Sequence, residues 1–152
     1  MRLSKNFVLS EIIRSGTAKR LSINNEPSKK HLQSLSLLIT NLIQPMRDDL
    51  GPIRISSGYR SNALNDAVGG SKTSQHSKGE ALDIDADIYG GITNKQIFDF
   101  VKNNLEFDQL IWEFGTDNEP NWIHVSIKHF GEQRKQILRA SRVRGKVHYS
   151  NY

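Results

Sequence analysis

The chain has 152 residues and contains no cysteine, which limits the chemistry it can carry. Without thiols there is no disulfide framework, no thiolate metal site and no cysteine nucleophile. Any metal must therefore be held by His, Asp or Glu side chains. Such nitrogen and oxygen donors suit zinc or another borderline divalent ion.

Long apolar runs are also missing from the sequence. No stretch approaches the roughly 20 apolar residues of a membrane-spanning helix, so no membrane insertion is expected. The N-terminal segment MRLSKNFVLSEIIRSG is not a signal peptide, because Ser10 and Glu11 break its apolar run and no small-residue cleavage site follows. If the protein acts outside the cell that makes it, something else must carry it there.

Acidic residues are outnumbered, with 16 Asp and Glu against 21 Lys and Arg, which gives a formal net charge of +5. This balance favours an anionic partner: nucleic acid, an acidic membrane surface or an anionic cell wall. Basic residues gather at 134–146, within a basic C-terminal segment that starts at about residue 130. A solvated basic tail explains this cluster equally well. The cluster lacks interleaved aromatic residues and matches no nucleic-acid motif, so we expect no nucleic-acid partner.

Two helices are predicted from the spacing of apolar residues. Between residues 27 and 50 these residues recur at steps of three and four, with Pro27 suited to a first helical position, Pro45 expected to bend or interrupt the helix, and Gly51 expected to end it. The inward positions are Leu32, Leu35, Ile39, Leu42, Met46 and Leu50. Thr93 and Gln96 form a capping-box pattern ahead of the second helix, at 95–105, with Ile97, Phe98, Val101 and Leu105 inward.

Short strand-like runs make up much of the remainder. The runs lie at 52–59, 80–88, 107–115 and 121–127, with one or two more expected between 135 and 150. Residues 60–68 read as a short helix or loop, and 69–79 as a loop by composition. We therefore predict one α+β domain covering residues 1–152, with a small, mostly antiparallel sheet packed against two or three helices.

Three residues stand out as possible metal ligands: His76, Asp83 and His124. Alternation in the run at 121–127 places His124 opposite the apolar Ile123 and Val125, and Asp83 likewise points away from its apolar neighbours. If the two strands are neighbours, the carboxylate and the imidazole converge, and His76 can join them from the preceding loop. Two His and one carboxylate form the ligand set of a catalytic zinc site.

Each of these residues also has an ordinary structural explanation. A loop histidine is usually solvated, and a strand aspartate is usually an edge charge. Alternation also places Asp85 and Asp87 on the face of Asp83, so that Asp85 competes with it as a ligand. Spacing alone does not decide between these readings.

The motifs themselves resemble a known family. SQHSKGEALD, residues 74–83, fits the pattern S-x-H-x-x-G-x-A-x-D, WIHVS supplies a later histidine, and SSGYR lies upstream. Together they resemble the zinc D-alanyl-D-alanine carboxypeptidase-like metallopeptidases, a group that includes phage endolysins and the hedgehog signalling domain. The resemblance runs from residue 7 to residue 126 and is closest to the small phage and prophage branch.

The resemblance implies a single zinc ion bound by His76, Asp83 and His124. It also implies that Arg60 contacts the substrate, by polarising the scissile carbonyl or steadying the oxyanion. A guanidinium suits this work because it keeps its proton and donates in a planar fork. The ligand is then Asp83, and Asp85 is expected to hydrogen-bond a ligand histidine.

Further residues of these motifs are expected to touch the substrate. Ser74 and Gln75 would sit at the rim and hydrogen-bond the substrate backbone, and Tyr59 of the SGYR motif is a third candidate. Gly79, between loop and strand, suits a positive φ.

The general base is where the sequence departs from the family pattern. Many relatives place an acidic residue three positions before the last histidine, but this chain has Asn121 there. Glu113 lies on the preceding predicted strand, where some members of the family have a glutamate close to the metal. Glu119 lies in the turn, five positions before His124. We expect Glu113 to be the base, because a strand holds a side chain more exactly than a polar turn, with Glu119 as the alternative.

These residues predict a monomeric zinc peptidase that cleaves peptidoglycan stem peptides. The two candidate activities are D,D-carboxypeptidase and L-alanyl-D-glutamate endopeptidase. Without a signal peptide, the expected setting is a phage lysin held in the host cytoplasm until holin-type release, or a virion-borne wall-degrading part. The alternative is a non-catalytic zinc module that binds a wall peptide or a protein, since a fold can persist where the chemistry has been lost.

Overall fold

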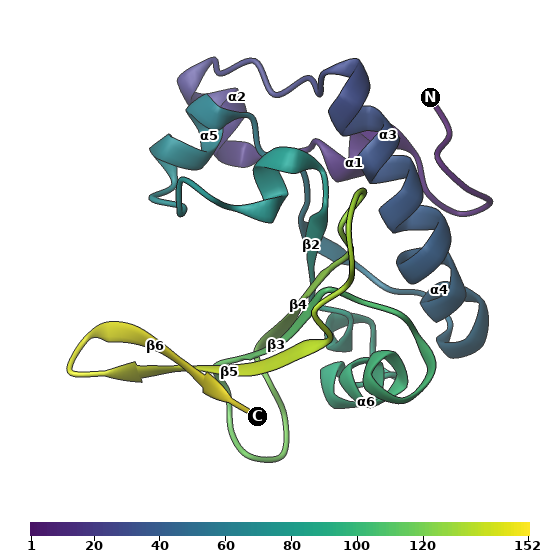
Figure 1. Ribbon diagram of the computed structural model, residues 1–152, viewed down its shortest axis with the longest axis vertical. Coiled ribbons are helices and arrows are strands. Elements are labelled where there is room, and N and C mark those ends of the chain that lie inside the picture. The colour runs from purple at the N-terminus through teal and green to yellow at the C-terminus, as the bar shows by residue number, and fades with distance from the viewer.

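The strands of the computed structural model, which describes residues 1–152, form one six-stranded sheet in the order β1-β2-β4-β3-β5-β6 (Figure 1). All neighbouring strands are antiparallel except β3 and β5, which are parallel. The strands are β1 Ile55–Ser57, β2 Ala81–Ile84, β3 Gln109–Glu113, β4 Trp122–Ser126, β5 Gln136–Val143 and β6 Lys146–Asn151. A mostly antiparallel sheet with a few helices confirms the predicted α+β class.

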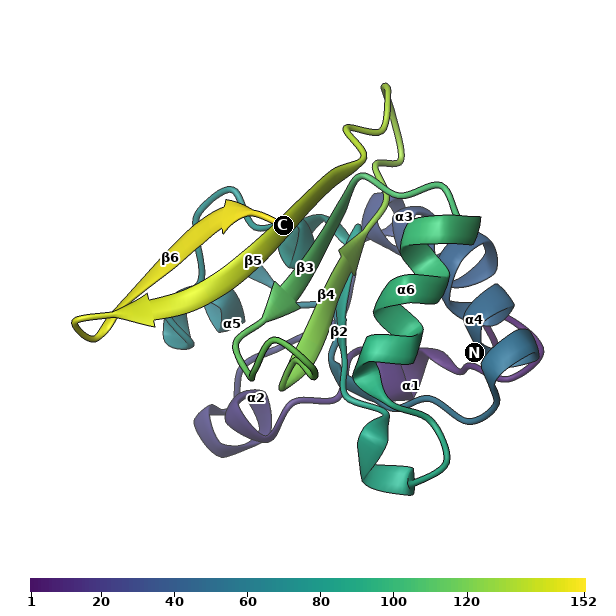
Figure 2. The ribbon, with the colours of Figure 1, turned by 90° about the horizontal axis from the view of Figure 1, so that it is seen from below.

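Helices cover one face of this sheet and bury the main core. α3 (Lys29–Leu38), η1 (Ile39–Ile43) and α4 (Gln44–Leu50) follow one another as a single helical segment, and α6 (Asn94–Asn104) lies alongside β3 and β4 (Figure 2). Each apolar side chain buried in this way contributes about 1.5–3 kcal/mol. Of the positions predicted to face inward, four in the first helical segment are fully buried, namely Leu35, Ile39, Leu42 and Met46. Leu32 and Leu50, at its two ends, are only partly buried.

The predicted interruption near Pro45 is confirmed and has a local cause. Pro45 has no N–H, so the carbonyl four residues before it cannot receive the usual helical hydrogen bond. Just before it, η1 widens into a π-helix, and the N–H of Gln44 donates to the carbonyl of Ile39, five residues back. The helix continues past the proline and ends at Gly51, which has a φ of +97°.

The predicted strand at 80–88 is too long. β2 ends at Ile84, and the chain then turns into the short 3-10 helix η3 (Asp87–Tyr89). Asn94 explains the turn, because its side-chain oxygen accepts from the N–H of Ala86 at 2.9 Å while its amide donates to the Asp85 carboxylate at 3.1 Å. Asp85 and Asp87 therefore do not continue the strand face that carries Asp83.

The short helices lie toward the N-terminal side of the fold. They are α1 (Leu9–Ile12), α2 (Gly16–Leu21), α5 (Asn62–Ala67) and the 3-10 helix η2 (Gln75–Lys78), which forms inside the segment predicted to be a loop. In Figure 1, α2 and α5 lie side by side above the open face of the sheet. None of the helices has the length and apolar character needed to cross a membrane.

The C-terminal segment forms the hairpin of β5 and β6, which extends the sheet beyond β3. Figure 1 shows the hairpin reaching away from the helices, and every residue of β6 is exposed. The predicted extra strands are therefore present. Because β5 runs parallel to β3, side chains from the hairpin join the face of the sheet opposite the helices.

Candidate metal centre and active-site cleft

The predicted metal ligands lie together on the open face of the sheet. Asp83 on β2 and His124 on β4 are direct cross-strand partners, and Asp83 Oδ1 lies 3.0 Å from His124 Nδ1. His76 reaches the same carboxylate oxygen from η2, with its Nε2 3.3 Å away. The alternation predicted for β4 is confirmed, since Ile123 and Val125 are fully buried on the opposite face.

The three side chains fit a zinc ion by both donor chemistry and spacing. One ligand atom from each lies within 4.8 Å of the other two. Two ligands bound to zinc at about 2.0–2.1 Å in tetrahedral geometry are ~3.3 Å apart, close to the two separations measured from Asp83. Burial raises the pKa of Asp83, but the charges and hydrogen bonds of His76 and His124 outweigh it and hold the pKa well below its usual range. The carboxylate is therefore ionised and available as a ligand.

His76 is held in a fixed orientation by the backbone. Its Nδ1 lies 2.8 Å from the carbonyl oxygen of Gly58, which can only accept, so Nδ1 carries the proton. The lone pair of a neutral imidazole is then on Nε2, the atom that faces Asp83. Gly79 closes η2 with the predicted positive φ, at +72°. A Cβ at Gly79 would come within 2.5 Å of the His31 carbonyl oxygen, so η2 packs against α3 at a distance that only glycine permits.

Arg60 lies beside the cluster and is tied to it. Its Nη2 is 3.4 Å from Asp83 Oδ2, and its Nε and Nη2 donate to Ser57 Oγ at 3.2 and 2.9 Å. The N–H of Arg60 also donates to the carbonyl of His76 at 3.3 Å. With these contacts fixed, Nη1 is the guanidinium nitrogen left to face a ligand.

Glu113 lies at the end of β3 on the same face as the cluster. Glu113 is only 7% exposed, and it lies directly opposite Trp122 of the neighbouring strand β4. Burial, together with the negative charge of Asp83, raises the pKa of Glu113 to about 7, although His124 lowers it. A carboxyl group with a pKa near neutrality can both accept and return a proton at physiological pH.

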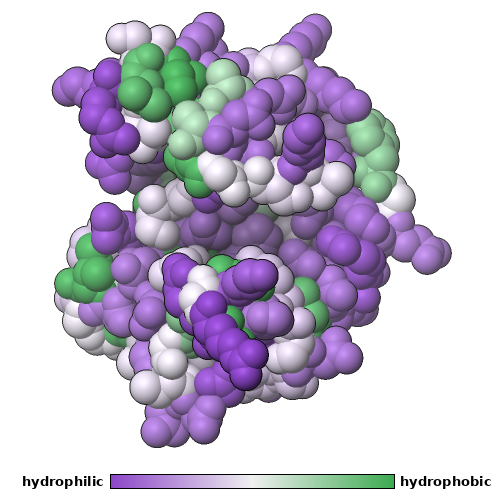
Figure 3. Space-filling model, turned by 90° about the vertical axis from the view of Figure 1, so that its left-hand side faces the viewer, coloured by the Kyte–Doolittle hydropathy of each residue, from purple (hydrophilic) through white to green (hydrophobic).

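These side chains line one cleft of about 560 Å³. Figure 3 shows a hydrophilic hollow between the upper and lower parts of this face. The hollow is walled by the segment around η2 on one side and by the hairpin on the other. Residues lining the cleft include Arg60, Ser74, Gln75, His76, Asp83, Glu113, Trp122, His124, Arg134, Leu138, Val147 and Tyr149.

Comparison with known proteins agrees with this geometry. A family model for peptidase M15 matches residues 5–126, most of the chain. The chain belongs to the peptidase M15 family. The match confirms the resemblance to zinc D-alanyl-D-alanine carboxypeptidase-like metallopeptidases, which are zinc-dependent, and the three clustered side chains form the candidate zinc site. A search of the curated proteins found no match.

Three residues predicted for the M15 site lie elsewhere. Glu119 does not line the cleft, and its carboxylate instead accepts from the N–H of Lys95 at 3.2 Å, at the start of α6. Tyr59 is buried in the core with its hydroxyl 3.0 Å from His31 Nδ1, so it is not at the cleft. The predicted hydrogen bond between Asp85 and a ligand histidine is not formed, because the Asp85 carboxylate accepts from Asn94 and the carbonyl of Gly58 accepts from His76.

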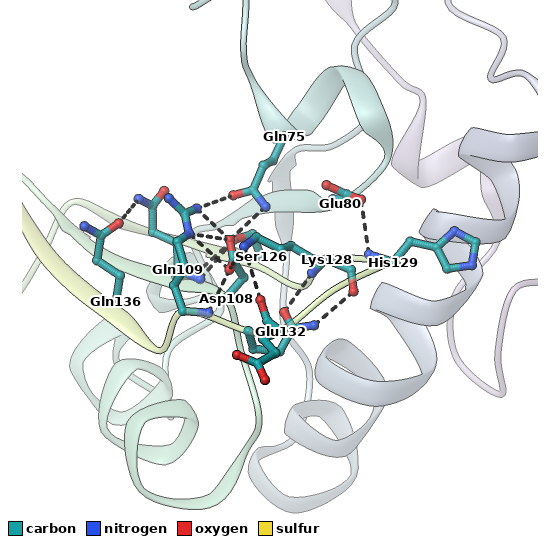
Figure 4. Close-up of polar contacts among 11 residues, drawn as sticks. Gln75, Glu80, Asp108, Gln109, Ser126, Lys128, His129, Glu132 and Gln136 are labelled. Atoms are coloured by element: carbon teal, nitrogen blue, oxygen red, sulfur yellow. Dashed lines mark hydrogen bonds and ion pairs between the residues drawn. The ribbon is translucent and has the colours of Figure 1, made fainter.

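A polar network at one end of the cleft was not predicted from the sequence. Asp108, just before β3, has a fully buried carboxylate that accepts from Arg134 and from Gln75 Nε2 at 3.0 Å (Figure 4). Lys128 Nζ lies 3.3 Å from the same carboxylate. Burial raises the pKa of Asp108, but the hydrogen bonds from Arg134 and Gln75 outweigh it and lower the pKa to about 2. Since Gln75 precedes His76, this network helps to fix the metal-facing helix η2.

The hairpin residues of the cleft were also missed. Leu138, Val147 and Tyr149 come from β5 and β6, beyond the stretch that matches the M15 family. Alternation would have placed Val147 and Tyr149 on one face of a strand. Assigning that face to the cleft also requires knowing that β5 pairs with β3 in parallel. This pairing joins segments far apart in the sequence, and the sequence does not reveal it.

Proposed function

We propose that this M15 protein is a zinc-dependent peptidase that hydrolyses peptide bonds of bacterial peptidoglycan. The observation that carries the proposal is the shared cleft, in which the cluster of His76, Asp83 and His124 lies beside Glu113 and Arg60. We further propose a wall-degrading role of the phage endolysin or virion-borne type, as either a D,D-carboxypeptidase or an L-alanyl-D-glutamate endopeptidase. The resemblance of the motifs to that branch supports this finer assignment.

Each side chain has a distinct part in the proposed hydrolysis. When bound, zinc polarises the scissile carbonyl and makes water a stronger nucleophile at neutral pH. Glu113 takes a proton from the attacking water and passes it to the leaving amine, which its pKa of about 7 permits. Arg60, fixed by Ser57 and Asp83, directs its free Nη1 to the carbonyl oxygen as negative charge develops.

The cleft walls supply positions for the peptide. Trp122, Leu138 and Val147 offer apolar surface for substrate side chains, and Ser74 offers a hydroxyl at the edge. One end of the cleft is formed by the Asp108 network and carries a net positive charge. Two cations, Arg134 and Lys128, lie there against the single carboxylate of Asp108. We propose that this end receives a carboxylate of the stem peptide.

The test is hydrolysis of purified peptidoglycan, measured as newly released amino groups. Activity should disappear with a chelator and return with zinc, and mass analysis of the fragments should name the bond that is cut. Glu113→Gln should abolish turnover while zinc binding is kept, and the matched variant Glu119→Gln should retain activity. Unchanged turnover in Glu113→Gln would exclude it as the base.

The same pair of variants distinguishes a peptidase from a non-catalytic zinc module. Asn121 stands where many relatives have an acidic residue before the last histidine, and it does not line the cleft. Glu113 supplies a carboxylate from the neighbouring strand instead. A protein that binds zinc and wall fragments but releases no amino groups in any condition would support the binding module.

A further inference from the structure

A second groove lies next to the cleft and is lined by an excess of positive charge. It has a volume of about 780 Å³ and lies between the segment around α2 and the segment that connects β1 to α5. Its basic residues are Arg14, Lys19, Arg20, Arg54 and Arg60, and no acidic residue lines it. We call it the basic groove.

Four of the five basic residues of the groove have no acidic partner within the protein, the exception being Arg60, which pairs with Asp83. Arg14, Lys19, Arg20 and Arg54 take part in none of the ion pairs of the structure and donate no side-chain hydrogen bond. Four cations without a protein partner around one hollow create a positive potential that attracts an anionic ligand.

Hydroxyl groups in the groove are also arranged as donors. Ser15 Oγ accepts from the N–H of Ala18 at 3.1 Å, and Ser57 Oγ accepts from Arg60 at 2.9 Å. With an N–H already on each oxygen, the O–H of both serines is free to donate to a ligand. A groove that offers guanidinium, ammonium and hydroxyl donors selects for an oxyanion.

The two walls of the basic groove are joined by hydrogen bonds. The N–H of Tyr59 donates to the carbonyl of Ile12 at 2.9 Å, and Asn25 Nδ2 donates to the carbonyls of Ile13 and Tyr59 at 2.8 and 3.0 Å. A Cβ at Gly58 would lie 2.0 Å from the Ile12 carbonyl oxygen, so the walls meet as closely as backbones can. The backbone frame of the groove is therefore preformed, and a ligand has to order only the basic side chains.

The groove is connected to the cleft through Arg60, which lines both hollows. We propose that the basic groove binds a phosphodiester polymer of the bacterial wall and thereby holds the cleft against its substrate. A polymer supplies repeated charges for several cations at once, which the few carboxylates of a stem peptide do not. Single-stranded nucleic acid is disfavoured because the one aromatic side chain of the groove, Tyr59, is buried and hydrogen-bonded to His31, leaving no platform for base stacking.

The test compares two triple variants with the same change of charge. Arg14→Gln/Lys19→Gln/Arg20→Gln removes three cations of the groove, and Arg142→Gln/Arg144→Gln/Lys146→Gln removes three from the C-terminal hairpin. Binding of each protein to soluble poly(glycerol phosphate) is measured at several salt concentrations. We expect the groove variant to bind more than about ten-fold more weakly, with a salt slope lower by about two, and the hairpin variant to lose less than about three-fold.

Three results would overturn the proposal. The first is an equal loss in both variants, or a larger loss in the hairpin variant, which would place binding elsewhere. The second is equally tight binding of poly-L-glutamate, which would remove the preference for phosphate. The third is single-stranded DNA of matched charge that binds more than ten-fold tighter than poly(glycerol phosphate), which would make the ligand a nucleic acid.

This experiment does not depend on turnover, although the biological setting rests on the proposed function. Equal melting temperatures of the wild-type and variant proteins show that the fold is intact. A protein that binds the polymer through the groove but never hydrolyses peptidoglycan keeps this inference and loses the proposed peptidase activity. A protein that hydrolyses peptidoglycan but binds the polymer equally well without the groove cations keeps the proposed peptidase activity and loses this inference.

Discussion

Asp83 and His124 are cross-strand neighbours whose side chains meet on the open face of the sheet, with Asp83 Oδ1 3.0 Å from His124 Nδ1. The register of β2 with β4 fixes this approach, because directly opposed residues of an antiparallel pair project to the same side. Both strands are rigid parts of the sheet, and their other faces are buried in the core. Two of the three candidate zinc ligands are therefore positioned before any metal binds.

This geometry predicts that zinc affinity depends on Asp83 and not on the nearby Asp85. Asp83→Asn removes the ionised ligand, and we expect zinc binding to weaken by more than the 10–100-fold typical of outer contacts. Asp85→Asn is the matched change two residues along, at a carboxylate that pairs with Asn94. When the metal-free proteins are titrated with zinc, Asp85→Asn should bind as much zinc as the wild type, and Asp83→Asn should bind less. If Asp85→Asn loses zinc and Asp83→Asn keeps it, Asp85 and not Asp83 is the ligand.

Local patterns predicted much of what surrounds the site. Alternation in β4 gave the correct face for His124, and the capping box of Thr93 and Gln96 forms as predicted, with both reciprocal hydrogen bonds. Gly79 has the expected positive φ. These features depend on contacts between residues close in sequence, where spacing and residue type determine the geometry.

Features set by distant contacts were not predictable in the same way. The alternation of apolar and polar residues continues through Asp85 in the sequence. In the structure, hydrogen bonds of Asn94, at the start of α6, with Asp85 and Ala86 turn the chain and end β2. Tyr59 belongs to a family motif, yet its hydroxyl is directed to His31 in the core. Asp108 is one acidic residue among 16, and only its burial beside Arg134 distinguishes it. Tertiary packing decides each of these cases.

Asp108 should stabilise the fold in a way that depends on pH. Its pKa is about 2 in the folded protein against an ordinary 3.8, so its contribution is fully present above about pH 4 and is lost as the pH falls toward 2. This difference corresponds to about 2 kcal/mol. Denaturant unfolding of wild type and Asp108→Asn should therefore differ most at neutral pH and converge as the solution is acidified.

The control for this change is Asp117→Asn. Asp117 pairs with Arg139 at the surface, and its side chain is 90% exposed, so its removal should alter the unfolding free energy by less than about 1 kcal/mol. Asp108→Asn should also weaken zinc binding, because a neutral amide holds Gln75, and with it η2, less strongly than the carboxylate does. A stability difference between wild type and Asp108→Asn that grows on acidification would contradict this account.

Gly79 should be intolerant of a side chain for two separable reasons. An alanine there is strained by the φ of +72° and would also place its Cβ 2.5 Å from the His31 carbonyl oxygen. Gly145→Ala isolates the first effect, since Gly145 has a φ of +77° and nothing within 4 Å of an added Cβ. We expect a loss of about 1–2 kcal/mol in Gly145→Ala and a larger loss in Gly79→Ala. Only Gly79→Ala should also weaken zinc binding, by displacing His76. Equal losses of stability in both variants would show that η2 adjusts without cost.

Tyr149 should contact the substrate from the C-terminal hairpin. It lines the cleft, where partial burial, followed by the negative charges of Glu113 and Asp83, raises the pKa of its hydroxyl, so that the group stays protonated and can donate. One hydrogen bond contributes about 0.5–1.5 kcal/mol, and we therefore expect Tyr149→Phe to lower kcat/KM by about two- to ten-fold with zinc content unchanged. Tyr149→Ala should cost more, because the ring is also part of the cleft wall.

Tyr152→Phe provides the matched control on the same strand end. Tyr152 packs against Phe98 and Trp112 on the helix-covered face, away from the cleft, so its hydroxyl should not affect turnover. Steady-state kinetics on a soluble stem-peptide fragment would measure both variants. If Tyr149→Phe keeps the wild-type kcat/KM while Tyr149→Ala loses it, the hairpin contributes apolar surface to the substrate but no hydrogen bond. If neither variant changes the rate, the peptide passes the cluster without contacting Tyr149, and the proposed substrate contacts of the hairpin are limited to Leu138 and Val147.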